Sequence, residues 1–579
     1  MIVKELLEPK SIAVIGASNT LAKPGGKVMQ NLLDTGFDGK IYAVNPKEDE
    51  VQGIKCFKSP EELPEVDLAI IAVASKFIPD TIDILADKKS TKAYIVLSAG
   101  FSEIGEEGKK MEDRIVEKVN STGGTLIGPN CIGVLSPKYA GVFAGPIPKL
   151  DPQGCDFVTG SGATAVFIVE AAIPMGLRFA SLFSVGNSAQ TGVEDVIKYW
   201  DESFDPETSA RTKMIYIEQI KKPEMFLKHT RSLIKKGCRI AALKAGTTDA
   251  GSRAVSSHTG ALAGSDIAVD ALFRKAGIVR CYSREELVQT SALFSYKELK
   301  GKRIAVITHA GGPGVMLTDT LVKGGLEVPH IEGPDAESLK EQLFHGSSVA
   351  NPIDFLATGT AEQLGIILDY VDEKFDNIDA SVVIFGTPGM FDVTPVYDVL
   401  NEKMNTCKKP IYPVLPSLIQ AKDAVDHFLS LGNVNIADEV NLGRTLCKIY
   451  NTPMPAEEES LPEVDNAAIR EIIDNSEDGY LLPEKVEALL EAANIPHAEE
   501  AYAENEEEAA EGAERLGFPL VMKVVGPVHK SDVDGVKLNI KNADEARETY
   551  RQMLKIKDAR GVLMQIGRAS CRERVYCEV

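Results

Sequence analysis

The sequence has little of several features that identify a class of protein directly. Among 579 residues there is one tryptophan, 6% are aromatic, and the nine cysteines show no CxxC spacing. Scattered cysteines of this kind exclude a disulfide framework and indicate reduced thiols of a cytosolic protein. No apolar run approaches the length of a membrane span, and the opening "MIVKELLEPKSIAVIG" lacks a signal-peptide pattern. We therefore expect a cytoplasmic protein without a membrane partner.

Positive charge is also scarce. The chain has 63 Lys and Arg against 85 Asp and Glu, a net charge of -22. Nucleic acids and anionic membranes need a basic face, so neither is an expected partner. An anionic small molecule must instead be held locally, by backbone N–H groups, helix N-termini or a few lysines.

What the chain does have is a repeated α/β pattern. Continuous apolar runs such as "SIAVIGAS" and "VDLAIIAVAS" alternate with amphipathic stretches, which predicts parallel sheets buried on both faces. The pattern restarts near "GCDFVTGSG" and again at "KRIAVITHAGG". We expect α/β units over residues 1–145, 146–297 and 298–452, a Pro- and Glu-rich linker over 453–466, and a shorter fourth region over 467–565.

Glycine-rich turns follow three of the expected strands. Gly16 in "VIGAS" allows a tight turn beside Ser18 and Lys23, although the spacing is not that of a dinucleotide motif, and a packing role is equally compatible with it. "TGSGATAVFIVEAA" (159–172) and "HAGGPGVMLTDTL" (309–321) each open an apolar helix, where N–H groups bind anions. Either turn alone is compatible with a structural role, but two in consecutive units suggest one anion held from both sides.

Four polar residues are candidates for chemistry. Glu218 ends the strand of "YIEQI", and His258 stands among small residues in "AVSSHTGALAG". His529 lies in "GPVHKSDVDGV", and Lys523 lies in "FPLVMKVV". A neutral imidazole is a nucleophile near pH 7, and a carboxylate beside it orients one ring nitrogen. For each of them a solvated or packed side chain without a chemical role remains the alternative.

The motifs taken together resemble the NDP-forming acyl-CoA synthetase family, in its acetate–CoA ligase (ADP-forming) branch, which is related to succinyl-CoA synthetase. "GASNTLAKPGGKVMQNL", "SAGFSEIGEEG", "GPNCIGV", "SHTGALAG", "HAGGPG" and "HKSDVDGV" occur in the order of that family. The resemblance extends to about Gln565. It implies an α/β chain with a Rossmann-like CoA-binding domain, two flavodoxin-like succinyl-CoA-synthetase-type domains and a partial ATP-grasp domain.

The resemblance implies a reversible reaction, acyl-CoA + phosphate + ADP to carboxylate + CoA + ATP. His258 would be the phosphorylated histidine, Glu218 would steady its ring, and His529 would be a second phosphorylated histidine. Mg²⁺ would accompany the nucleotide, with its ligands beyond the matched residues and none within this chain, and a homodimer is expected. The remaining implied contacts are, for CoA, Gly16, Ser18, Lys23, Asn45 and Pro46; near the thioester, Asn130, with Asn187 as a further neighbour of the site; for the nucleotide, Lys523; and for phosphate, Ser161, Gly162, Ala163, Gly312, Pro313 and Gly314.

Three residues depart from the family pattern. His309 replaces Asn, Asp534 replaces Gly, and Gln219 stands where Gly is frequent. Asp534 adds negative charge near the expected phosphate path, which weighs against the role of His529.

Other functions remain as alternatives. An NAD-dependent dehydrogenase needs an acidic residue after the second strand, where this chain has "AVNPK". A non-catalytic CoA or acyl-CoA sensor needs no His258. A module of a protein acetyltransferase needs a further domain that the sequence does not show.

The last residues do not follow the family. "IGRASCRERV" corresponds to a translated sequencing-adapter read, so we expect natural sequence to end near Gln565 and residues 566–579 to be adapter-derived. The ATP-grasp domain would then be truncated, and this chain incomplete for the nucleotide step. The strand around "GVLMQ" would lack its neighbours and be poorly ordered.

Overall fold

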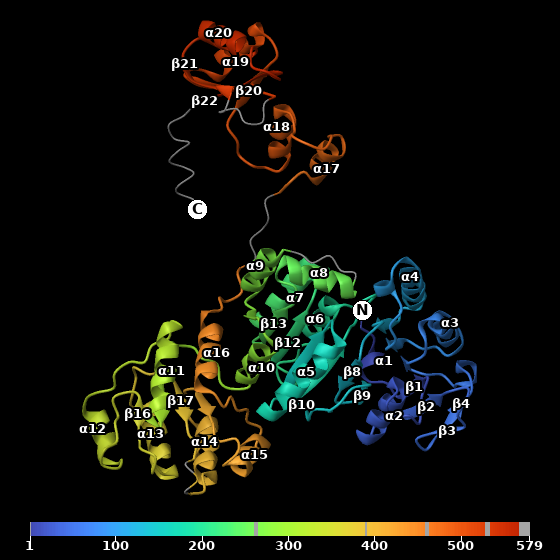
Figure 1. Ribbon diagram of the computed structural model, residues 1–579, viewed down its shortest axis with the longest axis vertical. Helices are drawn as coiled ribbons and strands as arrows, with labels where there is room; N and C mark the ends of the chain where they lie inside the picture. Colours follow the sequence, from blue (N-terminus) through green and yellow to red (C-terminus); the bar gives the residue numbers. More distant parts are fainter. Residues whose placement is uncertain are drawn as a thin grey trace. The chain divides into compact units, whose positions relative to one another are not determined.

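The structure is a computed structural model. It describes residues 2–259, 265–387, 389, 391–457, 463–526 and 533–566, except the side chains of 256–259. The chain divides into two compact units, Met1–Ala456 and Glu457–Val579, and the bulk of the described secondary structure lies in the first (Figure 1). Within the described residues, no helix is long and apolar enough to cross a membrane.

The first sheet of unit 1 has the strand order β3-β4-β2-β1-β5-β6-β7. Its strands are parallel except for the β3–β4 hairpin, and those at its centre are buried throughout. Because β1 pairs with both β2 and β5, the chain changes direction across the sheet at the end of β1, where open α/β sheets bind ligands. Its elements are α1 (Lys4–Leu7), β1 (Ser11–Ile15), α2 (Pro24–Asp34), β2 (Lys40–Val44), β3 (Glu50–Val51), β4 (Ile54–Phe57), β5 (Leu68–Ile71), α3 (Ile78–Lys88), β6 (Ala93–Val96), α4 (Glu106–Ser121) and β7 (Thr125–Ile127).

The second sheet has the order β14-β13-β12-β10-β11-β8-β9. Here the change of direction falls at the end of β10, between β11 and β12. The β8–β9 hairpin pairs with β11, so the boundary expected at residue 145 falls after two strands of this sheet. Its elements are β8 (Gly133–Ser136), β9 (Tyr139–Val142), β10 (Leu150–Thr159), α5 (Gly162–Ala172), β11 (Phe179–Ser184), α6 (Val193–Glu202), β12 (Thr212–Ile217), α7 (Pro223–Lys235), β13 (Arg239–Lys244), α8 (Asp249–Thr259), α9 (Asp266–Ala276), β14 (Val279–Cys281) and α10 (Arg284–Leu293).

The third sheet is parallel, with the order β16-β15-β17-β18. Its last helix, α16, packs on α10 of the preceding sheet and on α11, so the two flavodoxin-like parts share a helical contact. Its elements are β15 (Ile304–Thr308), α11 (Gly311–Lys323), α12 (Pro334–Glu341), β16 (Ile353–Asp354), α13 (Ala361–Glu373), β17 (Ala380–Ile384), α14 (Thr394–Thr406), β18 (Ile411–Val414), α15 (Lys422–Ser430) and α16 (Glu439–Asn451).

Unit 2 contains an antiparallel sheet of order β19-β22-β20-β21 with its own apolar core. The expectation that the strand around "GVLMQ" lacks neighbours is wrong. That strand is β22, and it pairs with β19 on one side and β20 on the other, because both partner strands precede it in the chain. Apolar residues of α19 and α20 complete the core of this sheet. The elements are α17 (Asn466–Asp474), α18 (Pro483–Ala492), β19 (Glu500–Ala503), α19 (Glu506–Leu516), β20 (Leu520–Val525), β21 (Val536–Ile540), α20 (Ala543–Met553) and β22 (Gly561–Ile566).

Candidate functional site

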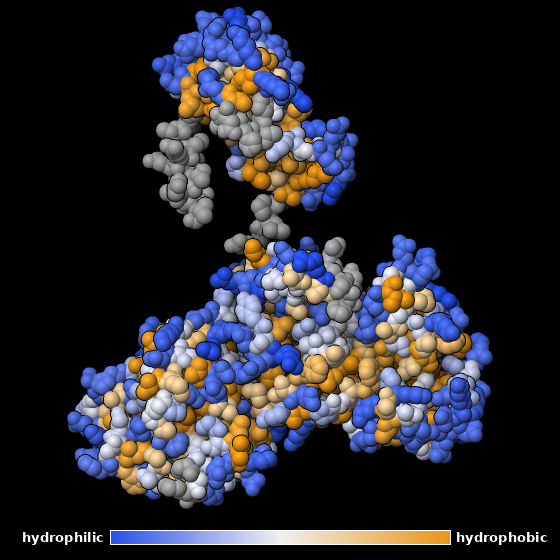
Figure 2. All heavy atoms as spheres, viewed as in Figure 1, coloured by the Kyte–Doolittle hydropathy of each residue, from blue (hydrophilic) through white to orange (hydrophobic). Residues whose placement is uncertain are grey.

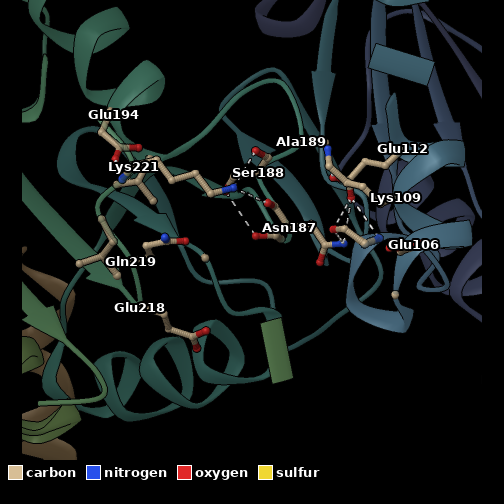
Figure 3. Close-up of a pocket in the computed structure, with 16 residues that line it drawn as sticks. Glu106, Lys109, Glu112, Asn187, Ser188, Ala189, Glu194, Glu218, Gln219 and Lys221 are labelled. Carbon is tan, nitrogen blue, oxygen red and sulfur yellow. Dashed lines mark hydrogen bonds and ion pairs between the residues drawn. The ribbon is translucent and has the colours of Figure 1, made fainter. Parts of the chain in front are cut away.

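A pocket of about 520 Å³ opens where the first two sheets meet. Its walls come from the turns that follow β10, β11 and β12 and from the start of α4 (Figure 3). Parallel strands present their carboxyl ends at one edge, so these turns converge although they are distant in sequence. The lining side chains include four carboxylates and two lysines, namely Glu106, Glu112, Glu194, Glu218, Lys109 and Lys221.

Asn187 lines this pocket from the turn after β11. Its Nδ2 donates to Glu103 Oε2 at 2.5 Å and lies 3.3 Å from Glu112 Oε2. Burial would raise the pKa of Glu103, but hydrogen bonds from the Gly100 N–H and from Asn187 hold it below its ordinary value. The turn is thereby fixed to the loop that follows β6. The sequence predicted Asn187 as a site residue but did not single out Glu103. The feature that could have identified Glu103 is its position in the family motif "SAGFSE".

Lys221 supports the same turn from the opposite wall, as Figure 3 shows. Its Nζ donates to the carbonyl oxygens of Asn187, at 3.0 Å, and Ser188, at 3.3 Å. Burial lowers the pKa of Lys221, and the nearby Glu112 and Glu194 oppose that shift. Sequence reasoning missed this lysine, which lies only three residues after Glu218 in "YIEQIKK".

Glu218 borders the pocket, as does Gly160, which lies two residues before the start of α5. Its Oε1 accepts from the Tyr216 hydroxyl at 3.4 Å. Burial raises the pKa of Tyr216 to about 12, and the charge of Glu218 adds to that shift. The carboxylate therefore lies next to a helix N-terminus, at the carboxyl end of β12.

The start of α5 is shaped by Thr159. Its Oγ1 accepts from the Ser161 N–H at 3.0 Å, and the Ser161 hydroxyl lies 2.9 Å from that of Thr164. A Cβ on Gly162 would lie 2.7 Å from Ile132 Cγ2, so packing requires glycine there. The N–H groups of Gly162 and Ala163 belong to the first helical turn, which leaves its donors without intrahelical partners.

The start of α11 repeats this local design. Thr308 Oγ1 accepts from the Ala310 N–H at 3.0 Å, as Thr159 does for Ser161. Its expected anion ligands Gly312, Pro313 and Gly314 follow in the first turn. However, none of residues 309–314 is among those that line the pocket at α5.

His309, one of the three departures from the family pattern, stands between Thr308 and Ala310, just before α11. Its ring stacks on Phe385 with 4.4 Å between centroids, and its Nδ1 lies 3.4 Å from the Ile384 carbonyl oxygen. Burial lowers the pKa of His309. The imidazole is thus packed as a neutral ring against the aromatic core of the third sheet.

The expected CoA contacts gather at the end of β1. Gly16 has φ +88°, and a Cβ there would lie 2.7 Å from the Ala72 carbonyl oxygen, so this turn requires glycine. Asn45 Nδ2 donates to the Ala17 carbonyl at 2.7 Å, and the Ser18 hydroxyl accepts from the Thr20 N–H at 3.1 Å. Lys23 precedes α2, and Pro46 follows Asn45.

Asn130 links the first two sheets. It has φ +59°, and its Nδ2 donates to Asn187 Oδ1 at 3.3 Å. It therefore lies beside the pocket, on the side of the first sheet.

Of the remaining predicted site residues, the structure describes Lys523 fully, His258 in its backbone alone and His529 not at all. The backbone of His258 lies near the end of α8, and its side chain lies outside the described part. His529 falls outside the described residues, as do 567–579 at the C-terminal end. Lys523 on β20 contacts Gln565 on β22 through a hydrogen bond between their side chains.

Three family models match the chain. A CoA binding domain matches residues 10–137, a succinyl-CoA ligase like flavodoxin domain matches 152–294, and an ATP-grasp domain matches 473–565. These matches correspond to the first sheet, the second sheet and unit 2.

Relatives extend over nearly the whole sequence. Acetate–CoA ligase [ADP-forming] I of Archaeoglobus fulgidus is 33% identical over 559 residues, 93% of this chain and 78% of the relative. A 4-hydroxybutyrate–CoA ligase [ADP-forming] of Nitrosopumilus maritimus is 29% identical, over 95% of this chain and 80% of the relative. Among solved structures, a dinucleotide forming acetyl-coenzyme A synthetase 1 of Ca. Korarchaeum cryptofilum, in complex with phosphate and ADP, matches with a TM-score of 0.69 and 27% identity, over 77% of this chain and 96% of that one.

Proposed function

Because this chain belongs to the family of ADP-forming acetate–CoA ligases, we propose that the pocket between its first two sheets is where the acyl group passes from CoA to phosphate. The overall reaction is acyl-CoA + phosphate + ADP to carboxylate + CoA + ATP, and it is reversible. Acetate is the proposed acid, since the relatives above 30% identity that cover most of the chain act on acetate.

The proposed chemistry has three transfers. A phosphate oxygen attacks the thioester carbonyl carbon, the C–S bond breaks, and the CoA thiolate leaves and takes up a proton. A ring nitrogen of His258 then attacks the phosphorus of the acyl phosphate, and the P–O bond to the acyl group breaks to release the carboxylate. Finally, an oxygen of the ADP β-phosphate attacks the phosphorus, the N–P bond breaks, and ATP forms.

One observation carries this assignment of roles. Glu218 lines the pocket together with Gly160, two residues before α5, and Asn187 with Asn130 lies toward the CoA-binding sheet. The side with Glu218 and Gly160 suits a phosphoryl group and an imidazole, since the helix start attracts anions and the carboxylate orients a ring N–H. The side with Asn187 and Asn130 suits the thioester. CoA bound at Gly16, Ser18 and Asn45 would extend to this side of the pocket.

The nucleotide step is proposed for unit 2, with Lys523 and His529 as its contacts. Mg²⁺, when bound, would neutralise the nucleotide phosphates. Among the described residues the metal-binding candidate is Glu487, Glu491 and His497, which includes an imidazole. Mg²⁺ prefers oxygen ligands, so this group does not fit it, and no step is assigned there.

We also propose a reducing, cytoplasmic location. In the described residues all seven cysteines are free and buried. Burial raises the pKa of several of them, Cys131 to about 12 and Cys238 to about 11, which keeps them as unreactive thiols.

Transfer of labelled phosphate tests the proposal. The chain incubated with acetyl-CoA and labelled phosphate should become labelled on a histidine, and His258→Asn should abolish the label while CoA binding persists. His427→Asn is a matched control, because that exposed ring pairs with Asp398 on the third sheet's helices, outside the pocket. Label that persists on a histidine of the His258→Asn chain would contradict the assignment.

A further inference from the structure

Unit 1 has a second cavity, of about 710 Å³, at the edge of the second sheet where β12 and β13 begin. Among the described residues it shares no lining residue with the pocket that contains Glu218. That pocket lies where the same parallel strands end, and the six residues of β12 span about 20 Å. The cavity is therefore at the opposite edge of the sheet from the site proposed for acyl transfer.

One wall of the cavity is the segment that follows α16, residues 452–455. A Cβ on Gly277 would lie 2.8 Å from Pro455 Cδ, so the two residues are in close contact. The next N–H, of Ala456, donates to the Lys275 carbonyl at 3.0 Å, and the Arg231 guanidinium donates to the Ala456 carbonyl. Figure 1 shows the chain running from the end of α16 to α9. This wall is therefore a fixed part of unit 1.

Positive charge gathers at this cavity, although the chain as a whole has a net charge of -22. Four cationic side chains and one carboxylate line it, namely Arg211, Arg239, Lys297, Lys300 and Glu298. Lys297 is already engaged, because its Nζ donates to carbonyl oxygens at the end of α14. Within the described part of the chain, none of the other three cations forms an ion pair. Three cations and one carboxylate leave two positive charges without a counter-charge.

Arg239 is the most enclosed of these cations. Its guanidinium lies over the Phe294 ring at 5.3 Å, and its Nη2 donates to the carbonyls of Phe294 and, at 2.9 Å, Tyr296. Its other N–H groups have no partner among the residues that the structure describes. Burial lowers the pKa of Arg239 and the charge of Arg211 adds to that shift, while Glu298 opposes it. An enclosed charge of this kind is costly unless an anion pairs with it.

The rest of the lining is mainly apolar and includes Ile234, Ile449 and Tyr450. Met454 stands at the rim, where it is 76% exposed. Figure 2 shows hydrophobic and hydrophilic side chains side by side on the surface of unit 1, and this cavity gathers both kinds around one space. A cavity of 300–1,000 Å³ with apolar walls and a few polar groups is the usual form of a small-molecule site.

The charge of the cavity indicates which anion it suits. Two uncompensated positive charges match a phosphate monoester, whose charge at neutral pH is about -1.5 to -2. Phosphate oxygens also fit the fork of N–H groups on an arginine. A lone carboxylate carries one charge, and a triphosphate carries more than this site neutralises. The apolar walls add the requirement that the phosphate be attached to an apolar body, which a sugar phosphate lacks and a nucleoside monophosphate has.

We propose that this cavity binds a nucleoside monophosphate, with its phosphate at Arg211 and Arg239 and its base against the apolar side chains. The reaction proposed above exchanges ADP and ATP, so a monophosphate bound here is an effector and not a substrate. It contacts the segment that leads out of unit 1 after α16 and would hold that segment against the second sheet. The inference does not depend on the role of the pocket that contains Glu218.

Calorimetric titration of the full chain with AMP tests the proposal, with adenosine and ribose 5-phosphate as comparison ligands. Adenosine keeps the base and lacks the phosphate, whereas ribose 5-phosphate keeps the phosphate and lacks the base. AMP should bind at least about tenfold more tightly than either, because it alone uses both the cations and the apolar walls.

A variant locates the binding. Arg211→Gln removes a charge from an exposed side chain and should weaken AMP binding roughly tenfold or more. Arg444→Gln is the matched control, because Arg444 is exposed on α16 and does not line the cavity. It should change the Kd for AMP by less than about twofold. Lys300→Gln, also on an exposed side chain, gives a second route if the Arg211 variant has an altered melting curve.

Three results would overturn the proposal. The first is a wild-type chain that does not bind AMP. The second is AMP binding that neither Arg211→Gln nor Lys300→Gln weakens, which would place the nucleotide at another site. The third is equal affinity for AMP and ribose 5-phosphate, or for AMP and adenosine, since the cavity would then not recognise both parts of the ligand. Tighter AMP binding that depends on Arg211 and not on Arg444 would support it.

Discussion

At the scale of single residues, the pocket depends on side chains that hold backbone turns in place. Lys221 donates to two carbonyl oxygens of the turn that carries Asn187, and Glu103 accepts from the Asn187 amide. Buried polar groups that satisfy one another in this way fix one arrangement of the turn. A change at Lys221 should therefore disturb substrate binding through Asn187.

Lys221→Met should raise the KM for acetyl-CoA in the labelling reaction by roughly fivefold or more, with a smaller fall in kcat. The methionine keeps an unbranched side chain, one atom shorter than that of lysine, but loses both hydrogen bonds to the turn. Lys221→Arg should restore much of the affinity, because a guanidinium can donate to both carbonyls. Equal kinetics for the methionine variant and the wild type would refute this role.

His309 should make stability depend on pH. Burial lowers its pKa in the folded chain, so the unfolded chain binds the proton more readily. The free energy of unfolding should be highest above the ordinary pKa of about 6.5 and fall as the pH drops toward the folded value, by about 1.4 kcal/mol for each pH unit between the two.

Urea unfolding of the wild type and His309→Asn from pH 7.5 to 5 measures the effect. The asparagine variant should lose less stability over that range. Parallel curves would show that His309 does not titrate differently on folding.

At the scale of helices and strands, the two glycine-rich helix starts differ in what their glycines do. Gly162 faces Ile132 closely, whereas Gly312 has open space around it. A glycine in the first helical turn is thus required by packing at Gly162 of α5. At Gly312 of α11 no neighbouring atom of the described residues requires it.

Gly162→Ala should destabilise the chain by about 1–3 kcal/mol, since the new methyl overlaps Ile132 Cγ2. Gly312→Ala should be neutral or stabilising by up to about 1 kcal/mol, because alanine is the better helix former. The shift in melting temperature of unit 1 measures both. A similar loss for the two variants would mean that the α11 start is packed as tightly as that of α5.

These elements also show how far the sequence predicts the fold. The strands that end just before Gly16, Gly160 and Glu218 are where their apolar runs and turn residues indicate. The directions of α5 and α11 could not be predicted, because they are set by contacts with α10 and α16, far away in sequence. The pairing of β8 and β9 with the second sheet, the place of β22 and the role of Lys221 depend on tertiary contacts in the same way.

At the scale of the whole molecule, every described residue that lines the pocket belongs to unit 1. The three sheets and their cores are complete within Met1–Ala456. Acyl transfer to phosphate and labelling of His258 should therefore not require unit 2.

A chain of residues 1–456 should fold and label from acetyl-CoA and phosphate at a rate within about threefold of the full chain. The initial rates of both proteins, measured at equal concentration, check this expectation. A folded but unlabelled fragment would show that unit 2 supplies a group to the first two transfers.

The central place of β22 has a consequence for synthesis on the ribosome. β19 bonds only to β22 among the described strands, so it has no partner until residues 561–566 leave the exit tunnel. More than 60 residues separate β19 from the end of β22, which at ordinary elongation rates is a wait of roughly 3–13 s. During that interval the edges of β19 and β20 are open to pairing with other nascent chains, so the speed of translation through this stretch and the presence of a chaperone should govern the yield of unit 2.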